Sequence, residues 1–188
     1  GSGIDIAFSA QQTTDGGYII AGYTSSYGAG MDDVYLVKTD ALGNKEWENT
    51  YGTNVSDFGR SVHQTTDGGY IIASSTNFYS AASDMWLIKT DASGNKEWEK
   101  ILGGSAADYA QCIDQTTDGG YIIVGETDSY GTGFLDVYLV KTDASGNMEW
   151  QKTFGGSEQE SGQFVQQTTD GGYIIGGFTL SYGAGSGD

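Results

Sequence analysis

The sequence predicts an all-β protein, a β-propeller of four-stranded antiparallel blades, and three observations indicate it. The stretch TTDGGYII occurs four times, at intervals of 52, 51 and 52 residues, beginning at Thr13, Thr65, Thr116 and Thr168. Repeats of about 40 to 50 residues are typical of propellers with four strands per blade. Glycine is abundant, at 31 of 188 residues, proline is absent, and the apolar runs are short, which favours many strands joined by tight turns.

The second repeat serves as the example for the strands of one unit. Strand a is DFGRSVHQ, which begins at Asp57 and ends in the turn TTDGG. Strand b is YIIASST, from Tyr70, and a loop rich in small residues leads to strand c, DMWLIKT, from Asp84. The turn DASGN at Asp91–Asn95 then leads to strand d, KEWEKIL.

Both turns contain residues that tolerate positive φ angles, as tight hairpins require. Gly68 and Gly69 follow Asp67 in the first turn, and Gly94 precedes Asn95 in the second. We therefore expect each unit to be an antiparallel meander. The second turn also superficially resembles a calcium loop, but it lacks the glycine at the sixth position and the glutamate at the twelfth, so we interpret it as a hairpin turn.

Strands b and c are apolar on both faces, as in YIIAG and VYLVK. A sheet with one solvated face would alternate apolar and polar residues instead. Burial on both faces is expected for a blade between two neighbouring blades. A parallel β-helix also buries its strands, but its coils are shorter and do not return through tight hairpins, so the propeller is favoured.

The units predict a single domain over residues 1–188 with an incomplete last blade. The blades cover approximately residues 5–52, 57–103, 108–155 and 160–188. Strands a and b occur four times, but strands c and d occur three times, which gives three full blades and a half blade. Three arrangements are open: two chains that complete one ring about a two-fold axis, a strained ring of four units, or a piece of a longer protein. We expect closure between two chains here and a longer parent protein in nature.

A tryptophan recurs seven residues after the first aspartate of each c–d turn, at Trp47, Trp98 and Trp150. The stretch KTDASGNKEW resembles the docking motif of quinoprotein-type propeller repeats and the Asp-box of sialidase-like propellers. The whole unit is similar to repeats of bacterial and archaeal surface proteins. This resemblance implies that the tryptophans lie between blades and that the protein is extracellular or on the cell surface. The chain departs from sialidases, because Arg60 is its single arginine, and it shows no quinone site.

The charge and the reactive residues exclude several functions. The formal net charge is −17, so nucleic acid and anionic membranes are disfavoured as partners. Cys112 is the single cysteine and replaces a serine of other repeats, so we interpret it as a packed thiol. His63 is the single histidine and its equivalents are Gln11, Asp114 and Gln166. A general base needs an oriented partner, so we expect no catalytic residue, no bound cofactor and no enzyme activity.

Acidic residues recur where strands a and c begin, and we expect them around one mouth of the central channel. They are Asp5, Asp57, Asp108 and Glu160 before or in strand a, and Asp33, Asp84, Asp136 and Asp188 at strand c. A ring of carboxylates is suited to Ca²⁺. In the alternative interpretation each acid caps its own blade, bound by loop amides, by the threonine that ends strand b, or by the lysine of strand c at Lys38, Lys89 and Lys141.

The sequence therefore predicts a non-catalytic binding, display or self-assembling scaffold. Its candidate ligands are a glycan or a protein, and a homodimer is expected to complete the ring. Two alternatives remain open. One is a structural propeller fragment with no ligand of its own. The other is a propeller hydrolase, which the deviating second repeat, with Arg60 and His63, weakly favours.

Overall fold

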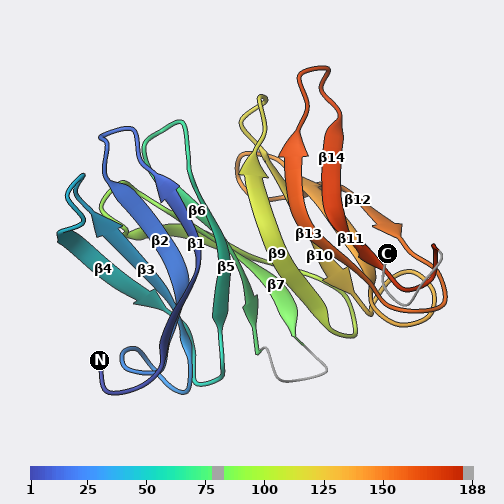
Figure 1. The fold of residues 1–188 in the computed structure, drawn as a ribbon, viewed down its shortest axis with the longest axis horizontal. Coiled ribbons are helices and arrows are strands. Elements are labelled where there is room, and N and C mark those ends of the chain that lie inside the picture. The colour runs from blue at the N-terminus through green and yellow to red at the C-terminus, as the bar shows by residue number, and fades with distance from the viewer. Residues whose placement is uncertain (78–82, 184–188) are drawn as a thin grey trace.

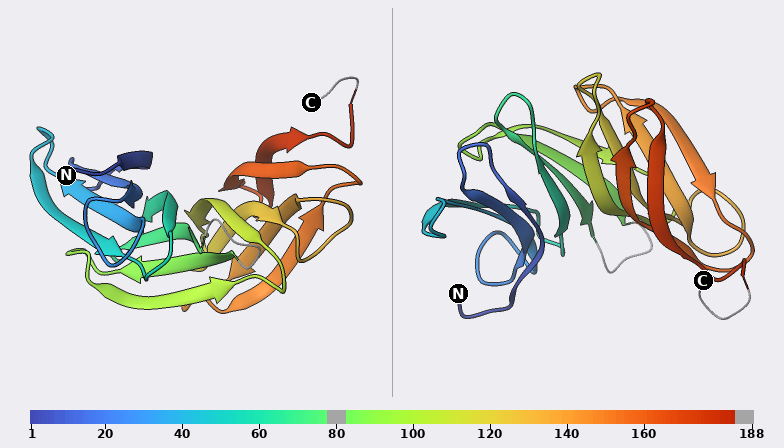
Figure 2. Two further views of the ribbon diagram at one scale, coloured as in Figure 1. Left: turned by 90° about the horizontal axis from the view of Figure 1, so that it is seen from below. Right: turned by 45° about the horizontal axis from the view of Figure 1, so that its top comes forward.

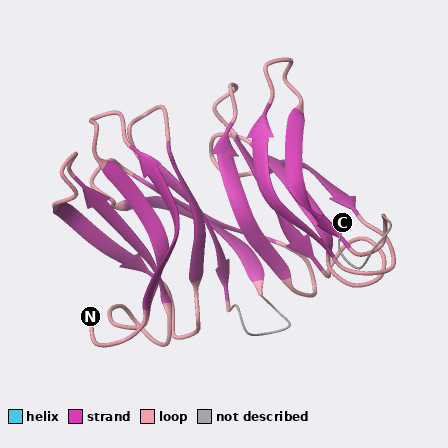
Figure 3. Ribbon diagram, viewed as in Figure 1, coloured by secondary structure: helices cyan, strands magenta, loops and turns pink. Residues whose placement is uncertain are grey.

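The structure, a computed structural model, describes residues 1–77 and 83–183, which form β-strands and no helix (Figures 1 and 3). The first sheet contains, in spatial order, β1 (Asp5–Gln12), β2 (Tyr18–Thr24), β3 (Asp33–Thr39) and β4 (Lys45–Tyr51). The second contains β5 (Phe58–Gln64), β6 (Tyr70–Thr76), β7 (Asp84–Thr90) and β8 (Lys96–Leu102). The third contains β9 (Asp108–Gln115), β10 (Tyr121–Thr127), β11 (Asp136–Thr142) and β12 (Met148–Phe154). The fourth pairs β13 (Glu160–Gln167) with β14 (Tyr173–Thr179).

Each of the first three sheets is the antiparallel meander that the turns predict, and the fourth is a single hairpin. In the first TTDGG turn the amide of Thr13 donates to the carbonyl of Gly17 at 2.9 Å, and the Asp15 carboxylate accepts from the Gly17 amide at 2.9 Å. Gly16 has a φ angle of 85°, and its equivalents in the other three turns lie within two degrees of this value. The repeated glycine thus supplies the left-handed conformation that closes every first hairpin.

Successive sheets stack face to face, and the apolar core lies between them. Ile19 and Leu36 of the first sheet pack with Ile72 and Ile88 of the second, and all four side chains are fully buried. Equivalent clusters join the second sheet to the third and the third to the fourth. The two-faced apolar pattern of strands b and c is explained by this stacking, because one face packs on the preceding sheet and the other on the following sheet.

The sheets follow one another along an open curve (Figure 2). Strand a of each sheet lies against strand a of its neighbour, so β1, β5, β9 and β13 are consecutive along the inner side of the curve. The first and last sheets stand at the two ends of the curve, and the described residues form no closed ring. A strained ring of four units, one of the three arrangements considered, is therefore not what this chain forms. The described part of the chain contains no helix that is long and apolar enough to cross a membrane.

Candidate functional site

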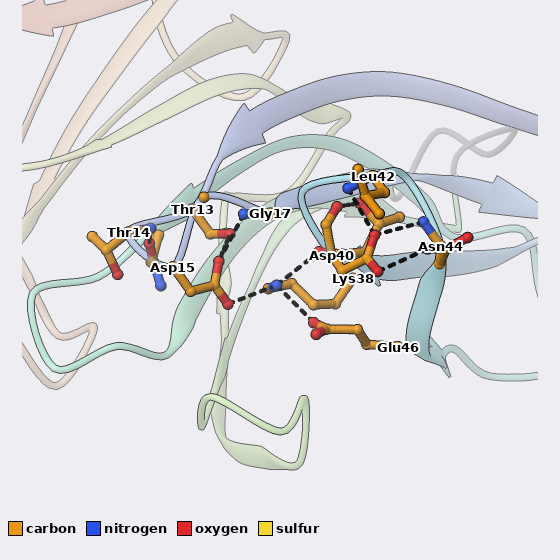
Figure 4. A network of polar contacts seen from close by, with 12 residues as sticks. Thr13, Thr14, Asp15, Gly17, Lys38, Asp40, Leu42, Asn44 and Glu46 are labelled. Carbon is orange, nitrogen blue, oxygen red and sulfur yellow. Dashed lines mark hydrogen bonds and ion pairs between the residues drawn. The ribbon is translucent and has the colours of Figure 1, made fainter.

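The lysine of strand c is buried at the end of each sheet that carries the two hairpin turns. The Nζ atom of Lys38 lies 2.8 Å from a carboxylate oxygen of Asp15, 2.8 Å from one of Glu46 and 2.8 Å from the carbonyl of Thr39 (Figure 4). Lys89 and Lys141 make the same contacts in the next two sheets. The expectation that these lysines pair with the acids where strands a and c begin is therefore wrong.

The reason is the direction of the strands. The TTDGG aspartate and the glutamate of strand d both lie at the turn end of the sheet, where the lysine of strand c also lies. Burial alone would lower the pKa of Lys141, but hydrogen bonds to Asp118 and Glu149 raise it above the usual value. Hydrogen bonds from Thr116, from the Gly120 amide and from Lys141 lower the pKa of Asp118 to about 2. These networks fix the turns to the sheet.

The c–d turn is a hairpin turn closed by its own aspartate, as the sequence predicts. The Asp91 carboxylate accepts from the Ser93 amide at 2.9 Å, from the Asn95 amide at 2.8 Å and from the Asn95 side chain at 2.9 Å. These bonds involve both carboxylate oxygens of Asp91 and fix the conformation of the turn.

Each recurring tryptophan contacts the tyrosine that begins strand b of the following sheet. The ring centroids are 5.8 Å apart for Trp47 and Tyr70, 6.0 Å for Trp98 and Tyr121, and 5.7 Å for Trp150 and Tyr173. The three tryptophans thus lie between consecutive sheets, at the positions that the resemblance implies.

The acids where strands a and c begin bind the main chain of the loop before them. The amide four residues earlier donates to each carboxylate, from Thr53 to Asp57 at 2.8 Å, from Gly104 to Asp108 at 2.7 Å and from Gly156 to Glu160 at 2.7 Å. Asp33 and Asp136 accept in the same way from Ala29 and Thr132. The threonine that ends strand b donates to Asp5 and to Glu160. Loop capping, one of the two interpretations of these acids, therefore accounts for part of their bonding.

The structure brings these acids together in pairs and not as one ring. Where consecutive sheets meet, the acid of strand c in one sheet faces the acid of strand a in the next. The three pairs are Asp33 with Asp57, Asp84 with Asp108, and Asp136 with Glu160. Asp5 instead binds the N-terminal amine at 2.8 Å, and Asp188 lies outside the described residues. Among the residues described, no group of three or more acids, histidines or cysteines is arranged to hold a metal ion.

The inner strands line a groove of about 620 Å³ on the concave side of the curve. It contains a contact that sequence reasoning missed: Nδ1 of His63 lies 3.3 Å from a carboxylate oxygen of Asp114. The two residues are equivalent positions of neighbouring repeats, and equivalent positions of strand a meet across the groove. The equivalence of His63 and Asp114 in neighbouring repeats was the sequence signal that could have predicted this contact. Cys112 also lines the groove, and its Sγ atom lies 3.9 Å from the carbonyl of Val165.

Comparison with known proteins defines a fold and no family. Neither a protein-family model nor a curated protein matches the sequence. A solved structure of a protein of unknown function from Bacteroides caccae is similar with a TM-score of 0.59 at 10% sequence identity. The similarity covers 90% of this chain and 52% of that one, so this chain spans about half the length of that protein.

Proposed function

We propose that this chain is a non-catalytic, self-assembling scaffold of the β-propeller type, whose open curve is completed by a second copy of the chain. One observation carries the proposal. The first and the fourth sheet each have one face whose equivalent in the inner sheets is buried against a neighbouring sheet. On these two end sheets that face is exposed.

The first of these surfaces is the face of the fourth sheet that points away from the third sheet. Ile122 of the third sheet is fully buried under the fourth sheet, whereas Ile174, at the equivalent position, is 61% exposed. Phe164 on the adjacent strand is 69% exposed. An uncovered apolar sheet face of this kind is a docking surface for another protein or an aggregation hazard.

The second surface is the face of the first sheet that points away from the second sheet. Tyr18 is 40% exposed, whereas Tyr70 and Tyr121, its equivalents, are 2% exposed because each packs on a tryptophan of the preceding sheet. Ile20 is likewise partly exposed, while Ile72 and Ile123 are fully buried. The first sheet therefore offers the surface that, inside the chain, always receives a preceding sheet.

Two copies satisfy both surfaces at once. The fourth sheet of each chain covers the first sheet of the other, and a two-fold axis relates the two contacts, so the assembly closes and does not grow into a filament. The interface repeats the part of the sheet-on-sheet contact that strands a and b make three times within the chain. The solved structure of similar fold, about twice the length of the matched region, supports an assembly of about this size. The resemblance to surface-protein repeats favours an extracellular or cell-surface location.

Light scattering during size-exclusion chromatography tests this proposal over about 1 to 200 µM protein. We expect the mass to rise from that of the 19.9 kDa chain to twice that value. Ile174→Asp should keep the chain monomeric, because it places a charge in the apolar contact. Leu42→Asp, in a turn where the side chain is 87% exposed, is the matched control and should leave association unchanged. A wild-type chain that stays monomeric throughout, or equal effects of the two variants, would contradict the proposal.

A further inference from the structure

The paired acids between consecutive sheets, named the junction pairs below, have an arrangement that loop capping leaves unexplained. They are Asp33–Asp57, Asp84–Asp108 and Asp136–Glu160. In the third pair a Cβ atom added to Gly155 would collide with Oδ1 of Asp136 and Oε2 of Glu160 together. In the second pair Gly103 is in the same position: a Cβ there would lie 2.7 Å from Oδ2 of Asp108 and would also collide with Oδ1 of Asp84. In these two pairs the two carboxyl groups thus converge on the same glycine of the loop that joins the sheets, and in the first pair Gly52 lies in the corresponding place against the carboxyl group of Asp33.

Each junction pair presents a buried oxygen to which no protein group donates. Asp33, Asp108 and Asp136 are at most 1% exposed, and Oδ1 of each has no hydrogen-bond partner among the described residues. For Asp33 and Asp136, the other oxygen accepts from the loop amide at 2.7 Å. In the third pair the unpartnered Oδ1 of Asp136 lies at the same glycine as Oε2 of Glu160, a carboxylate oxygen that has no proton to donate when Glu160 is ionised. A buried charge in this position is costly, and either a bound cation or a proton can neutralise it.

The buried lysines of strand c lie away from the junction pairs. Lys38, Lys89 and Lys141, the buried lysines of the sheets, are held at the opposite, turn end by the TTDGG aspartates and by the glutamates of strand d. The charged groups that raise the pKa of Asp33 are Asp57 and the neighbouring Asp32, both acidic. The other two pairs are influenced in the same way by their own members.

We propose that each junction pair binds one Ca²⁺ ion, which joins two consecutive sheets. Two carboxylates match the charge of a divalent cation and supply up to four oxygens. Calcium accepts irregular sets of carboxylate, main-chain carbonyl and water oxygens, whereas Mg²⁺ requires a near-octahedral set and keeps its water. The ion would neutralise both charges of a pair where the loop glycine leaves no room for a side chain.

A proton is the competitor for the same oxygens. Burial and the neighbouring carboxylate raise the pKa of Asp33, Asp84 and Asp136 above the usual value for aspartate. A proton bound by one of these aspartates would take the place of the ion, so calcium binding should weaken as the pH is lowered. Calcium should consequently stabilise the protein more at pH 7.5 than at pH 5.

Isothermal titration calorimetry and thermal unfolding of the whole chain, at pH 7.5 and constant ionic strength, test the proposal with CaCl₂ and MgCl₂ as probes. We expect about three Ca²⁺ ions per chain and an upward shift of the midpoint temperature of about 5 °C or more at a concentration 100 times the dissociation constant. Magnesium should produce a smaller shift.

Asp136→Asn separates a specific site from general attraction of cations to an acidic protein. The asparagine oxygen can still accept from the Thr132 amide and its amino group can donate to Glu160, so this variant should fold and should bind one Ca²⁺ ion fewer. Asp128→Asn removes the same charge from an exposed position and should leave the stoichiometry unchanged. The midpoint temperature could instead be unchanged by calcium and rise as the pH is lowered from 7.5 to 5. That result would show that the pairs share protons, and it would overturn the proposal. Equal losses in the two variants would overturn it as well.

Discussion

Two isoleucines at the same position of different repeats allow a direct test of the stacked sheets. Ile122 is fully buried between the third and fourth sheets, and Ile174 is 61% exposed on the last one. Their chemistry and strand position are the same, so the difference between Ile122→Ala and Ile174→Ala measures what one covering sheet contributes.

The structure gives the size of the expected difference. Removing a fully buried isoleucine side chain loses its transfer free energy and leaves a cavity, for a combined cost of about 2 to 5 kcal/mol. Ile122 packs among Val124, Leu139 and Val165, and these side chains lie on strands that cannot collapse into the gap. We therefore expect a loss of about 3 to 4 kcal/mol for Ile122→Ala. At an exposed position the change is usually within about 0.5 kcal/mol.

Urea unfolding followed by tryptophan fluorescence measures both variants. The protein should be at about 0.5 µM, so that the face of the fourth sheet is uncovered. The slope of the free energy of unfolding against urea should be equal in wild type and variants, so that the midpoints can be compared. Equal losses in the two variants would refute the stacking of the fourth sheet on the third. At about 100 µM, Ile174→Ala should become destabilising if a second copy covers that face.

Three further outcomes follow from the lysine networks, the turn aspartates and the tryptophans. The double variant Asp67→Asn, Glu97→Gln should destabilise the protein by more than Lys89→Met does, because it leaves a buried ammonium group without its two carboxylates. Urea unfolding of both variants measures the two losses in the free energy of unfolding. A larger loss in Lys89→Met would contradict this expectation. The pKa of Asp118 is lowered to about 2 in the folded state, so its contribution to stability is complete above its unfolded value of about 4 and is lost as the pH falls toward 2. Thermal unfolding from pH 5 to pH 2 should therefore show a smaller decline in Asp118→Asn than in wild type, and parallel declines would count against this assignment. Trp98→Ala should cost about 2 to 4 kcal/mol through loss of the contact with Tyr121, whereas Leu42→Ala in the exposed turn should change the free energy of unfolding by less than about 0.5 kcal/mol.

The strands could be predicted from the sequence because their turns carry local signals. Gly68 and Gly94 occupy the left-handed positions that close the two hairpins of the second sheet, with φ angles of 87° and 77°. Such positions depend on a few neighbouring residues, so the sequence alone places them. The two-faced apolar pattern of strands b and c likewise follows from the stacking of one sheet on the next.

The partners of the charged side chains could not be predicted as well, because they depend on which ends of the strands meet. Lys89 was expected to bind an acid at the start of a strand, but it lies at the turn end with Asp67 and Glu97. His63 and Asp114 were treated as alternatives at one repeat position, yet they contact each other, because strand a of one sheet runs beside strand a of the next. Repetition identifies equivalent residues, and the packing of the sheets decides which of them touch.

The repeated turn and second strand of the four a–b hairpins have a consequence for folding. The hairpin of strands a and b in each unit closes across a turn of a few residues. It therefore forms quickly, because its contacts are local in sequence. Strand b of one unit could nevertheless pair with strand a of another, within the chain or between chains, because the TTDGG turn is identical in all four units and strand b begins with YII in each. Refolding at high concentration should therefore give exchanged, kinetically trapped species, and slow dilution at low concentration should give the highest recovery of native protein.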